Sequence, residues 1–214
     1  ERALALDDRL PAAHGIAASV AFGYEWDWVA AEASYNRILA LNPGDAFTHG
    51  DHAWFLLNRR RDEEALREIG CAIDLDPLMP LFYGWSVGLH TAVGRMDEAL
   101  RMFAKAVELD PTFGLPYFHA ALTHLRLGNL DEARRVVEAG SRIAVHPGWG
   151  EGVLAHIAMR QGQPDEARRI VQEMIEARQR TNASPVGIAW ALAFQQRLDE
   201  ALVWLERGIE EHDT

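Results

Sequence analysis

The sequence has little of several features that mark whole classes of protein. It contains a single cysteine, Cys71, which excludes a disulfide scaffold and a zinc cluster built from cysteines. It has no run of about 18 apolar residues, so a membrane-spanning helix is not expected. Basic residues are in deficit, with 21 Lys and Arg against 32 Asp and Glu and a formal charge of −11, which argues against nucleic-acid binding.

What the chain does have is a core-forming composition and a strict internal period. Of its 214 residues, 49% are hydrophobic and 25% are charged, as is usual for a protein that buries a core. Alanines recur every 34 residues, at Ala31, Ala65, Ala99, Ala133, Ala167 and Ala201. The same register holds three prolines and three glycines, namely Pro43, Pro77, Pro111, Gly94, Gly128 and Gly162. A period of this length indicates stacked repeats.

Each unit predicts two helices joined by a short turn. The first helix ends near the glycine, which tolerates the positive φ of a helix C-terminus. The second begins at a recurring Asp-Glu pair, where we expect Asp to cap the helix and both acids to suit its dipole. It ends at Asp-Pro, because Pro disfavours helix in the preceding residue. The predicted pairs are 12–24 with 28–41, 46–58 with 62–75, 80–92 with 96–109, 114–127 with 130–144, 149–161 with 164–178, and 183–196 with 198–211.

This unit resembles the tetratricopeptide repeat, a 34-residue helix–turn–helix that carries small residues at these positions. Tyr83 and Tyr117 keep the aromatic residue usual in the first helix, whereas Gly15 and Glu151 depart from it. The resemblance implies an all-α fold, a right-handed α-superhelix of about six units forming a single domain over 1–214. The expected units lie near 12–45, 46–79, 80–113, 114–147, 148–181 and 182–214, with 1–11 as the tail of a preceding repeat.

A narrower resemblance concerns the context of the repeats. The Tyr-Glu-Trp-Asp-Trp stretch at 24–28 and the segment ALVWLERGIEEHD at 201–213 are similar to repeat regions of certain bacterial signalling proteins. In those proteins the repeats follow an adenylate-cyclase, winged-helix or kinase domain, so the resemblance implies a regulatory setting without choosing the effector. Both ends read as cut through an array, which predicts a piece of a longer chain or ends that associate.

No metal site is expected from the histidines. His49, Asp51 and His52 fall within one helical turn, but a catalytic zinc site needs about three convergent ligands, and the HEXXH motif is absent. The alternative, that His49 and His52 fill half-buried packing positions, accounts for them without a metal. His90 and His124 share one repeat position and are expected to be paired core groups.

No catalytic residue and no cofactor are expected either. The motifs of serine nucleophiles and of phosphate-binding loops are missing. Cys71 stands in an apolar pattern with Ile69 and Ile73, which predicts a buried, inert thiol.

Candidate binding residues come from the inner surface, because the resemblance implies that the first helices line a concave groove. They are Gly50, Trp54, Asn58, Gly84, Gly88, Phe118, Arg126, His156, Arg160 and Trp190. Glycine inside a helix costs about 1 kcal/mol relative to Ala, so three glycines on this surface require a reason. One hypothesis is that they open room beside Trp54 and Phe118 for a partner segment. The alternatives are tight helix packing and sequence drift.

A second hypothesis concerns Arg126 and Arg160, which are 34 residues apart and therefore occupy equivalent places on adjacent units. On an acidic protein, two inner arginines can accept a carboxylate from a partner. The alternative is that each arginine satisfies a helix C-terminus and points to water.

Together these observations predict a non-catalytic protein–protein interaction module, the regulatory or scaffold part of a cytoplasmic bacterial signalling or transcription protein. Its groove would bind a peptide or helix from another protein or from another domain of the same chain. One alternative is an enzyme on a helical scaffold, which would need convergent acids or a metal triad. The other is self-association through uncapped repeat ends.

Overall fold

The computed structural model describes residues 10–143, 149–181 and 184–211. These residues form twelve helices and no strand, which confirms the all-α prediction. The predicted bounds lie within three residues of the observed ones, and the predicted tail at 1–11 falls largely outside the described residues. The pairs are α2 (Pro11–Gly23) with α3 (Trp28–Leu41), α4 (Ala46–Asn58) with α5 (Asp62–Leu75), α6 (Pro80–Ala92) with α7 (Met96–Leu109), α8 (Leu115–Leu127) with α9 (Leu130–Ser141), α10 (Trp149–Arg160) with α11 (Pro164–Thr181), and α12 (Pro185–Phe194) with α13 (Leu198–Glu210).

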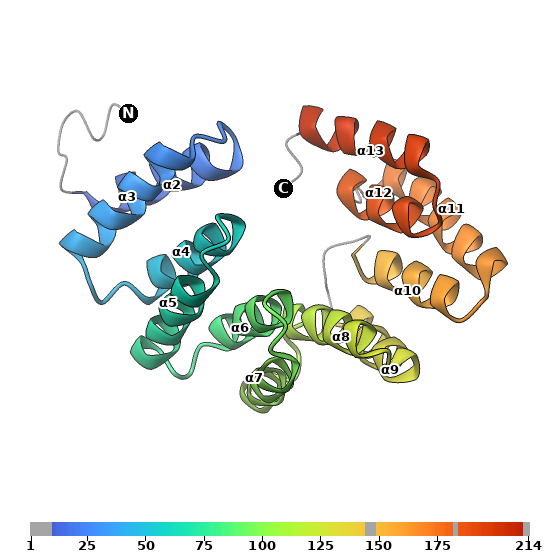
Figure 1. The fold of residues 1–214 in the computed structure, drawn as a ribbon, viewed down its shortest axis with the longest axis horizontal. Helices are drawn as coiled ribbons and strands as arrows, with labels where there is room; N and C mark the ends of the chain where they lie inside the picture. The colour runs from blue at the N-terminus through green and yellow to red at the C-terminus, as the bar shows by residue number, and fades with distance from the viewer. Residues whose placement is uncertain (1–9, 144–148, 182–183, 212–214) are drawn as a thin grey trace.

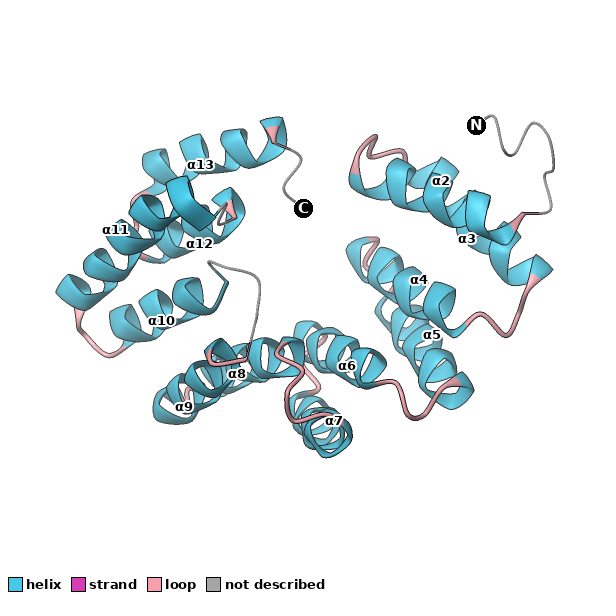
Figure 2. Cartoon of the chain, turned by 180° about the vertical axis from the view of Figure 1, so that it is seen from behind, coloured by secondary structure: helices cyan, strands magenta, loops and turns pink. Residues whose placement is uncertain are grey.

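The pairs follow one another along an arc and form a superhelix (Figure 1). The view from behind shows only helices and short connections along the same arc (Figure 2). In both views α6 and α10 lie on the inner side of the arc, whereas α7 and α11 lie on the outer side. Neighbouring first helices also pack together, α6 against α8 and α10 against α12, so each unit buries surface against the next.

The turn inside each pair uses a left-handed residue. Gly94, Gly128 and Gly162 have φ of 85°, 80° and 73°, as predicted for a glycine after a helix C-terminus. The same register in the other three units carries non-glycine residues with φ of 54°, 59° and 60°, at Trp26, Arg60 and Gln196. The geometry therefore repeats in all six units, although only three of them use the residue that adopts it without strain.

The starts of the second helices differ from the prediction. The residues before α5, α7, α9 and α13 make no side-chain cap bond, and the acids of each cluster lie inside the first turn of the helix instead. The capping prediction was therefore wrong, while the acids do sit at the positive end of the helix dipole. Many of them pair with an arginine three residues away, as Glu64 does with Arg61 and Glu132 with Arg135.

The recurring alanines mark the closest approach of the helices. Ala31, Ala65, Ala99, Ala133 and Ala167 are fully buried, and Ala201 is 4% exposed. Larger side chains fill three successive clusters along the array, around Phe55 and Phe82, around Val153 and Ile157, and around Ile188 and Leu192. The core thus runs the length of the arc.

Cys71 is exposed, so the prediction of a buried thiol was wrong. The buried residues of α5 are Ala65, Ile69 and Ala72, which follow the spacing of a helix. The pattern Ile69, Cys71, Ile73 has a spacing of two, which would place residues on one side of a strand but not of a helix.

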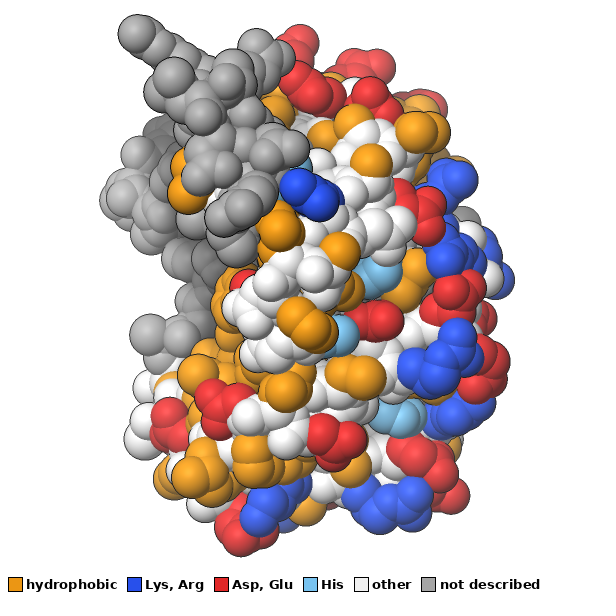
Figure 3. All heavy atoms as spheres, turned by 90° about the vertical axis from the view of Figure 1, so that its left-hand side faces the viewer, with side chains coloured by type: hydrophobic (Ala, Val, Ile, Leu, Met, Phe, Trp, Pro, Cys, Tyr) orange, Lys and Arg blue, Asp and Glu red, His pale blue; other side chains and the backbone are white. Residues whose placement is uncertain are grey.

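The outer surface is mixed in charge. On the face shown in Figure 3, basic and acidic side chains lie next to one another down one side, as the local ion pairs require. Among the described residues, none of the helices is long and apolar enough to cross a bilayer.

Candidate binding groove

Two concavities line the inner surface, and they share Trp54. The first, which we call the aromatic chamber, has a volume of about 620 Å³. It is lined by Ser19, Phe22, Gly23, Trp26, Trp28, Tyr35, Asp51, Trp54, Asn58 and Trp85. The second, which we call the arginine chamber, has a volume of about 600 Å³. It is lined by Trp54, Gly88, Thr91, Ala92, Phe118, His119, Leu122, Leu125, Arg126, His156, Arg160, Trp190 and Phe194.

Most of the predicted groove residues meet in the arginine chamber. Seven of the ten lie there, contributed by five successive first helices, namely Trp54, Gly88, Phe118, Arg126, His156, Arg160 and Trp190. Asn58 lines the aromatic chamber, where its amide donates to the carbonyl of Trp54 at 2.9 Å. The 34-residue period therefore does bring equivalent positions of distant repeats onto one surface.

Gly88 allows Trp54 to cross between neighbouring units. A Cβ on Gly88 would come within 2.8 Å of the Trp54 ring and 2.9 Å of the His119 ring, closer than van der Waals contact permits. The rings of Trp54 and His119 are 5.8 Å apart, and His119 contacts the carbonyl of Gly84 through Nδ1 at 2.8 Å. Gly88 thus shapes the boundary between the two chambers.

Gly50 and Gly84 lie below the groove surface instead of opening it. The space above Gly50 is taken by Trp85, whose ring would lie 2.5 Å from an added Cβ. The space above Gly84 is taken by Pro116, at 3.2 Å. Both glycines are buried, so for these two positions the geometry favours the alternative of tight helix packing.

The two arginines of the groove have different surroundings. Arg126 donates to the carbonyls of Thr91 and Ala92, at 2.7 and 3.3 Å, and so caps the C-terminus of the neighbouring helix α6. Arg160 is exposed and makes no hydrogen bond or ion pair with another described residue. The alternative of helix capping thus describes Arg126, although the helix that it caps is that of the adjacent unit and not its own. Arg160, in contrast, keeps its donors available.

Histidines add bulk but little charge to the arginine chamber. His156 stacks on Phe194 with the ring centroids 3.6 Å apart. Burial, with a smaller contribution from Arg160, lowers the pKa of His156, and burial also lowers the pKa of His119. Both rings therefore favour the neutral form near pH 7, and the arginines supply the charge.

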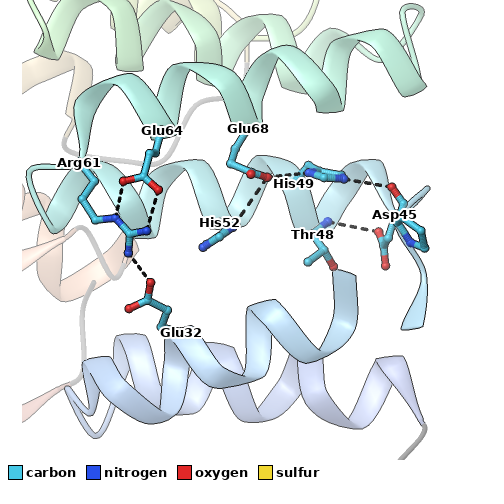
Figure 4. Close-up of polar contacts among 9 residues, drawn as sticks. Glu32, Asp45, Thr48, His49, His52, Arg61, Glu64 and Glu68 are labelled. Atoms are coloured by element: carbon cyan, nitrogen blue, oxygen red, sulfur yellow. Dashed lines mark hydrogen bonds and ion pairs between the residues drawn. The ribbon is translucent and has the colours of Figure 1, made fainter. Parts of the chain in front are cut away.

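The two histidines considered as metal ligands pack between helices instead. Figure 4 shows His49 and His52 of α4 both directed at Glu68 of α5. His49 Nδ1 lies 2.6 Å from Glu68 Oε2 and its Nε2 lies 3.1 Å from the Pro43 carbonyl, while His52 Nδ1 is 3.7 Å from the same carboxylate. His52 also stacks on the ring of Tyr35, with the centroids 5.1 Å apart. These contacts fit the packing alternative.

The same figure shows how one arginine joins two units. Arg61, at the start of α5, pairs with Glu64 of its own helix and with Glu32 of α3. His90 and His124, the other predicted pair, do not share such a link: His90 Nδ1 lies 2.8 Å from the Ser86 carbonyl of its own helix, and His124 Nδ1 has no hydrogen-bond partner among the described residues.

The sequence interpretation missed most of the aromatic chamber. Trp26 and Trp28 flank the turn between α2 and α3, Trp85 follows a glycine on α6, and Asp51 was considered only as a metal ligand. Asp51 and Trp85 share one repeat position, 34 residues apart, whereas Trp26 and Trp28 stand at the turn between two helices. One usable signal was present, since four of the seven tryptophans in the chain fall between residues 26 and 85.

Comparison with protein families agrees with the repeat geometry. Two family models, both described as tetratricopeptide repeat, match residues 90–148 and 153–214, which together exceed half of the chain. The chain belongs to the tetratricopeptide repeat family. Such arrays are typically non-catalytic scaffolds, and the chain is accordingly a protein–protein interaction scaffold. No curated protein is significantly similar to it in sequence.

Solved structures share the fold at low sequence identity. A thermophilic tetratricopeptide repeat protein of Thermus thermophilus is 18% identical, with 86% of this chain and 97% of that chain covered and a TM-score of 0.68. PilW, a type IV pilus biogenesis factor, is 19% identical, with 84% and 81% covered and a TM-score of 0.69. Yeast Tom70 is 19% identical over 96% of this chain but only 44% of its own, with a TM-score of 0.67.

Proposed function

We propose that the concave groove binds a peptide segment of a protein partner, and that the chain carries out no catalysis itself. The segment can come from another protein or from another domain of the same chain. The observation that carries this proposal is the convergence of five first helices on the arginine chamber, which combines Trp54, Phe118 and Trp190 with two arginines. Aromatic and arginine side chains in a concave site are the residues that most often dominate binding.

The chemistry of the arginine chamber suggests what it recognises. Its aromatic and leucine side chains suit an apolar anchor, while Arg160 offers unpaired donors at the rim. A guanidinium binds a carboxylate through two parallel hydrogen bonds. We therefore expect a peptide with an apolar side chain next to an acidic group.

The sequence context extends this proposal to the kind of protein that contains these repeats and to the compartment in which it acts. The similarity of residues 24–28 and 201–213 to repeat regions of bacterial signalling proteins favours a regulatory or scaffold part of a signalling or transcription protein acting in the cytoplasm. The full open reading frame around this segment tests that context, because an adjacent cyclase, kinase or winged-helix domain would support it and a different setting would replace it.

A peptide selection tests the binding proposal directly. Peptides selected from a random displayed library are synthesised with a fluorescent label, and their affinities are measured by anisotropy. Trp190→Ala and Arg160→Ala should each weaken binding at least about tenfold, which corresponds to about 1.4 kcal/mol. The matched controls outside the groove are Val29→Ala, an exposed apolar residue, and Arg101→Ala, an exposed arginine paired with Glu98.

The controls should leave the affinity unchanged. Equal losses in groove and control variants, or a selection that returns no binding peptide, would contradict the proposal. Circular dichroism of each variant confirms that the fold is intact before affinities are compared.

A second candidate function, self-association, is favoured by the exposed face of α13. Large apolar side chains there are more than a third exposed, at Leu198, Leu202, Val203, Leu205 and Ile209. An apolar face of this kind often marks a protein contact. Light scattering over a range of concentrations tests it, since a dimer that Leu202→Glu dissociates would support self-association and a strict monomer would remove it.

A further inference from the structure

The aromatic chamber differs from the rest of the groove because its lining combines four indole rings with a single carboxylate. Trp26, Trp28, Trp54 and Trp85 line it from the first three helix pairs, together with Asp51 of α4. None of the described residues that line the chamber is basic. Tryptophan rings attract cations over their faces, so this combination of walls and charge suits a positively charged group.

Asp51 lacks the partner that a buried carboxylate normally has. It is half-buried and makes no hydrogen bond or ion pair with another described residue. Burial, assisted by the nearby charge of Asp45, raises the pKa of Asp51 to about 6. Unpaired and desolvated carboxylates cost stability, and such groups are concentrated at functional sites.

Trp26 is a second unusual feature of the same chamber. Its φ is +54° at a position where three other units have glycine, and its side chain remains 52% exposed. A bulky residue in the left-handed region costs of order 1 kcal/mol, and a side chain this exposed does not offset that cost by packing into the core. A role in lining a ligand-binding site gives a reason for tryptophan at this position.

We propose that the aromatic chamber binds an arginine side chain of the partner, with the guanidinium stacked on the indole rings and hydrogen-bonded to the carboxylate of Asp51. This inference rests on the proposed function, because the arginine belongs to the peptide held in the groove. A guanidinium suits the site better than an ammonium because it is planar, weakly hydrated and able to stack while donating to a carboxylate.

The chain itself shows that one of these rings accepts such a group. The guanidinium carbon of Arg59, which is not among the lining residues, lies 5.5 Å from the ring centroid of Trp28. The opposite charges of the two chambers also give the peptide a direction, with its arginine toward α2 and its acidic group toward Arg160.

A small probe tests the site without any peptide. The probe is N-acetyl-arginine methylamide, titrated at constant ionic strength while the indole N–H signals of the seven tryptophans are followed by NMR. We expect saturable shifts for the indoles of Trp26, Trp28, Trp54 and Trp85, and smaller shifts for Trp190 and Trp204 in the same spectrum.

Two variants separate binding from folding. Asp51→Asn should weaken the probe about tenfold, because the charge-assisted hydrogen bond is lost. Trp26→Gly should weaken it about fivefold while relieving the backbone, so loss of binding there is not loss of fold. Asp74→Asn, on the exposed surface of α5, is the matched control and should change nothing.

Each outcome decides the proposal. Shifts that stay linear, shifts that match those caused by N-acetyl-alanine methylamide, or an affinity for the arginine probe that is unchanged in Asp51→Asn would overturn it. N-acetyl-lysine methylamide binding as tightly as the arginine probe would overturn the guanidinium assignment. Because the probe is not a peptide, it can bind even if the peptide selection fails, so failure of this inference and failure of the proposed function are distinguishable.

Discussion

The unpaired carboxylate of Asp51 makes a prediction about stability that is opposite to the usual effect of mutating a groove residue. Replacing it by Asn keeps the shape and removes the charge. The shift of its pKa from 3.8 to about 6 means that the folded chain disfavours the ionised form. At about 1.4 kcal/mol per pKa unit the shift sets an upper bound of about 3 kcal/mol. Because the carboxyl is partly exposed, we expect Asp51→Asn to stabilise the fold by about 1.5 kcal/mol at pH 7.

The pH dependence follows from the sign of this shift. Between pH 4 and 6 the folded state binds more protons at Asp51 than the unfolded state does, so the wild-type chain loses stability as the pH rises through this range. The Asn variant has no such group. The difference in unfolding free energy between the two chains should therefore be small near pH 4 and reach its full value above pH 6.

Urea unfolding followed by circular dichroism at pH 4, 5, 6 and 7 measures this difference, and the effects of carboxylates that do not interact with Asp51 cancel in it. Asp74→Asn, an exposed carboxylate, serves as the control and should stay within about 0.5 kcal/mol of wild type. A neutral or destabilising effect of Asp51→Asn at pH 7, or a gain that does not vary with pH, would refute the reasoning.

Two further predictions concern backbone and packing. Arg60→Gly should raise the unfolding free energy by about 0.5 kcal/mol, because Arg60 has φ of 59°, whereas Gly128→Ala, at 80°, should lower it by about 1 kcal/mol; urea titrations at pH 7 check both signs. Gly70→Ala should stabilise α5 by about 1 kcal/mol, since nothing lies within 4 Å of the added Cβ. Gly140→Ala should cost about 2 kcal/mol, since that Cβ would lie 2.6 Å from the Cβ of Tyr117, and thermal unfolding of this matched pair should give opposite shifts.

The sequence predicted the backbone of this protein better than its surface. The 34-residue period located every helix pair, because small residues, turn glycines and closing prolines act locally and repeat. It did not predict that Arg60 and Gln196 adopt the same left-handed turn without glycine, because the fold imposes that conformation against local preference.

The groove was predicted only in part, because the repeat period does not show which contacts neighbouring helices make. Equivalent positions such as Arg126 and Arg160 do share one surface, but only Arg160 keeps its donors available, because Arg126 bonds to the end of α6. Likewise Gly50 and Gly84 look open in the sequence and are filled by Trp85 and Pro116. The repeat period predicts the position at which each side chain leaves the backbone, whereas the packing of neighbouring helices determines how much space remains open around that position.

Taken together, the two proposals require a partner that lies along the inner groove and contacts both chambers. A selected peptide that carries a nitroxide label tests this arrangement through the paramagnetic broadening of the indole N–H signals. Trp54, which lines both chambers, and Trp190 should broaden, while Trp204 of α13 should not. Broadening of Trp204 with sharp signals from Trp54 and Trp190 would place the peptide outside the groove and contradict both proposals.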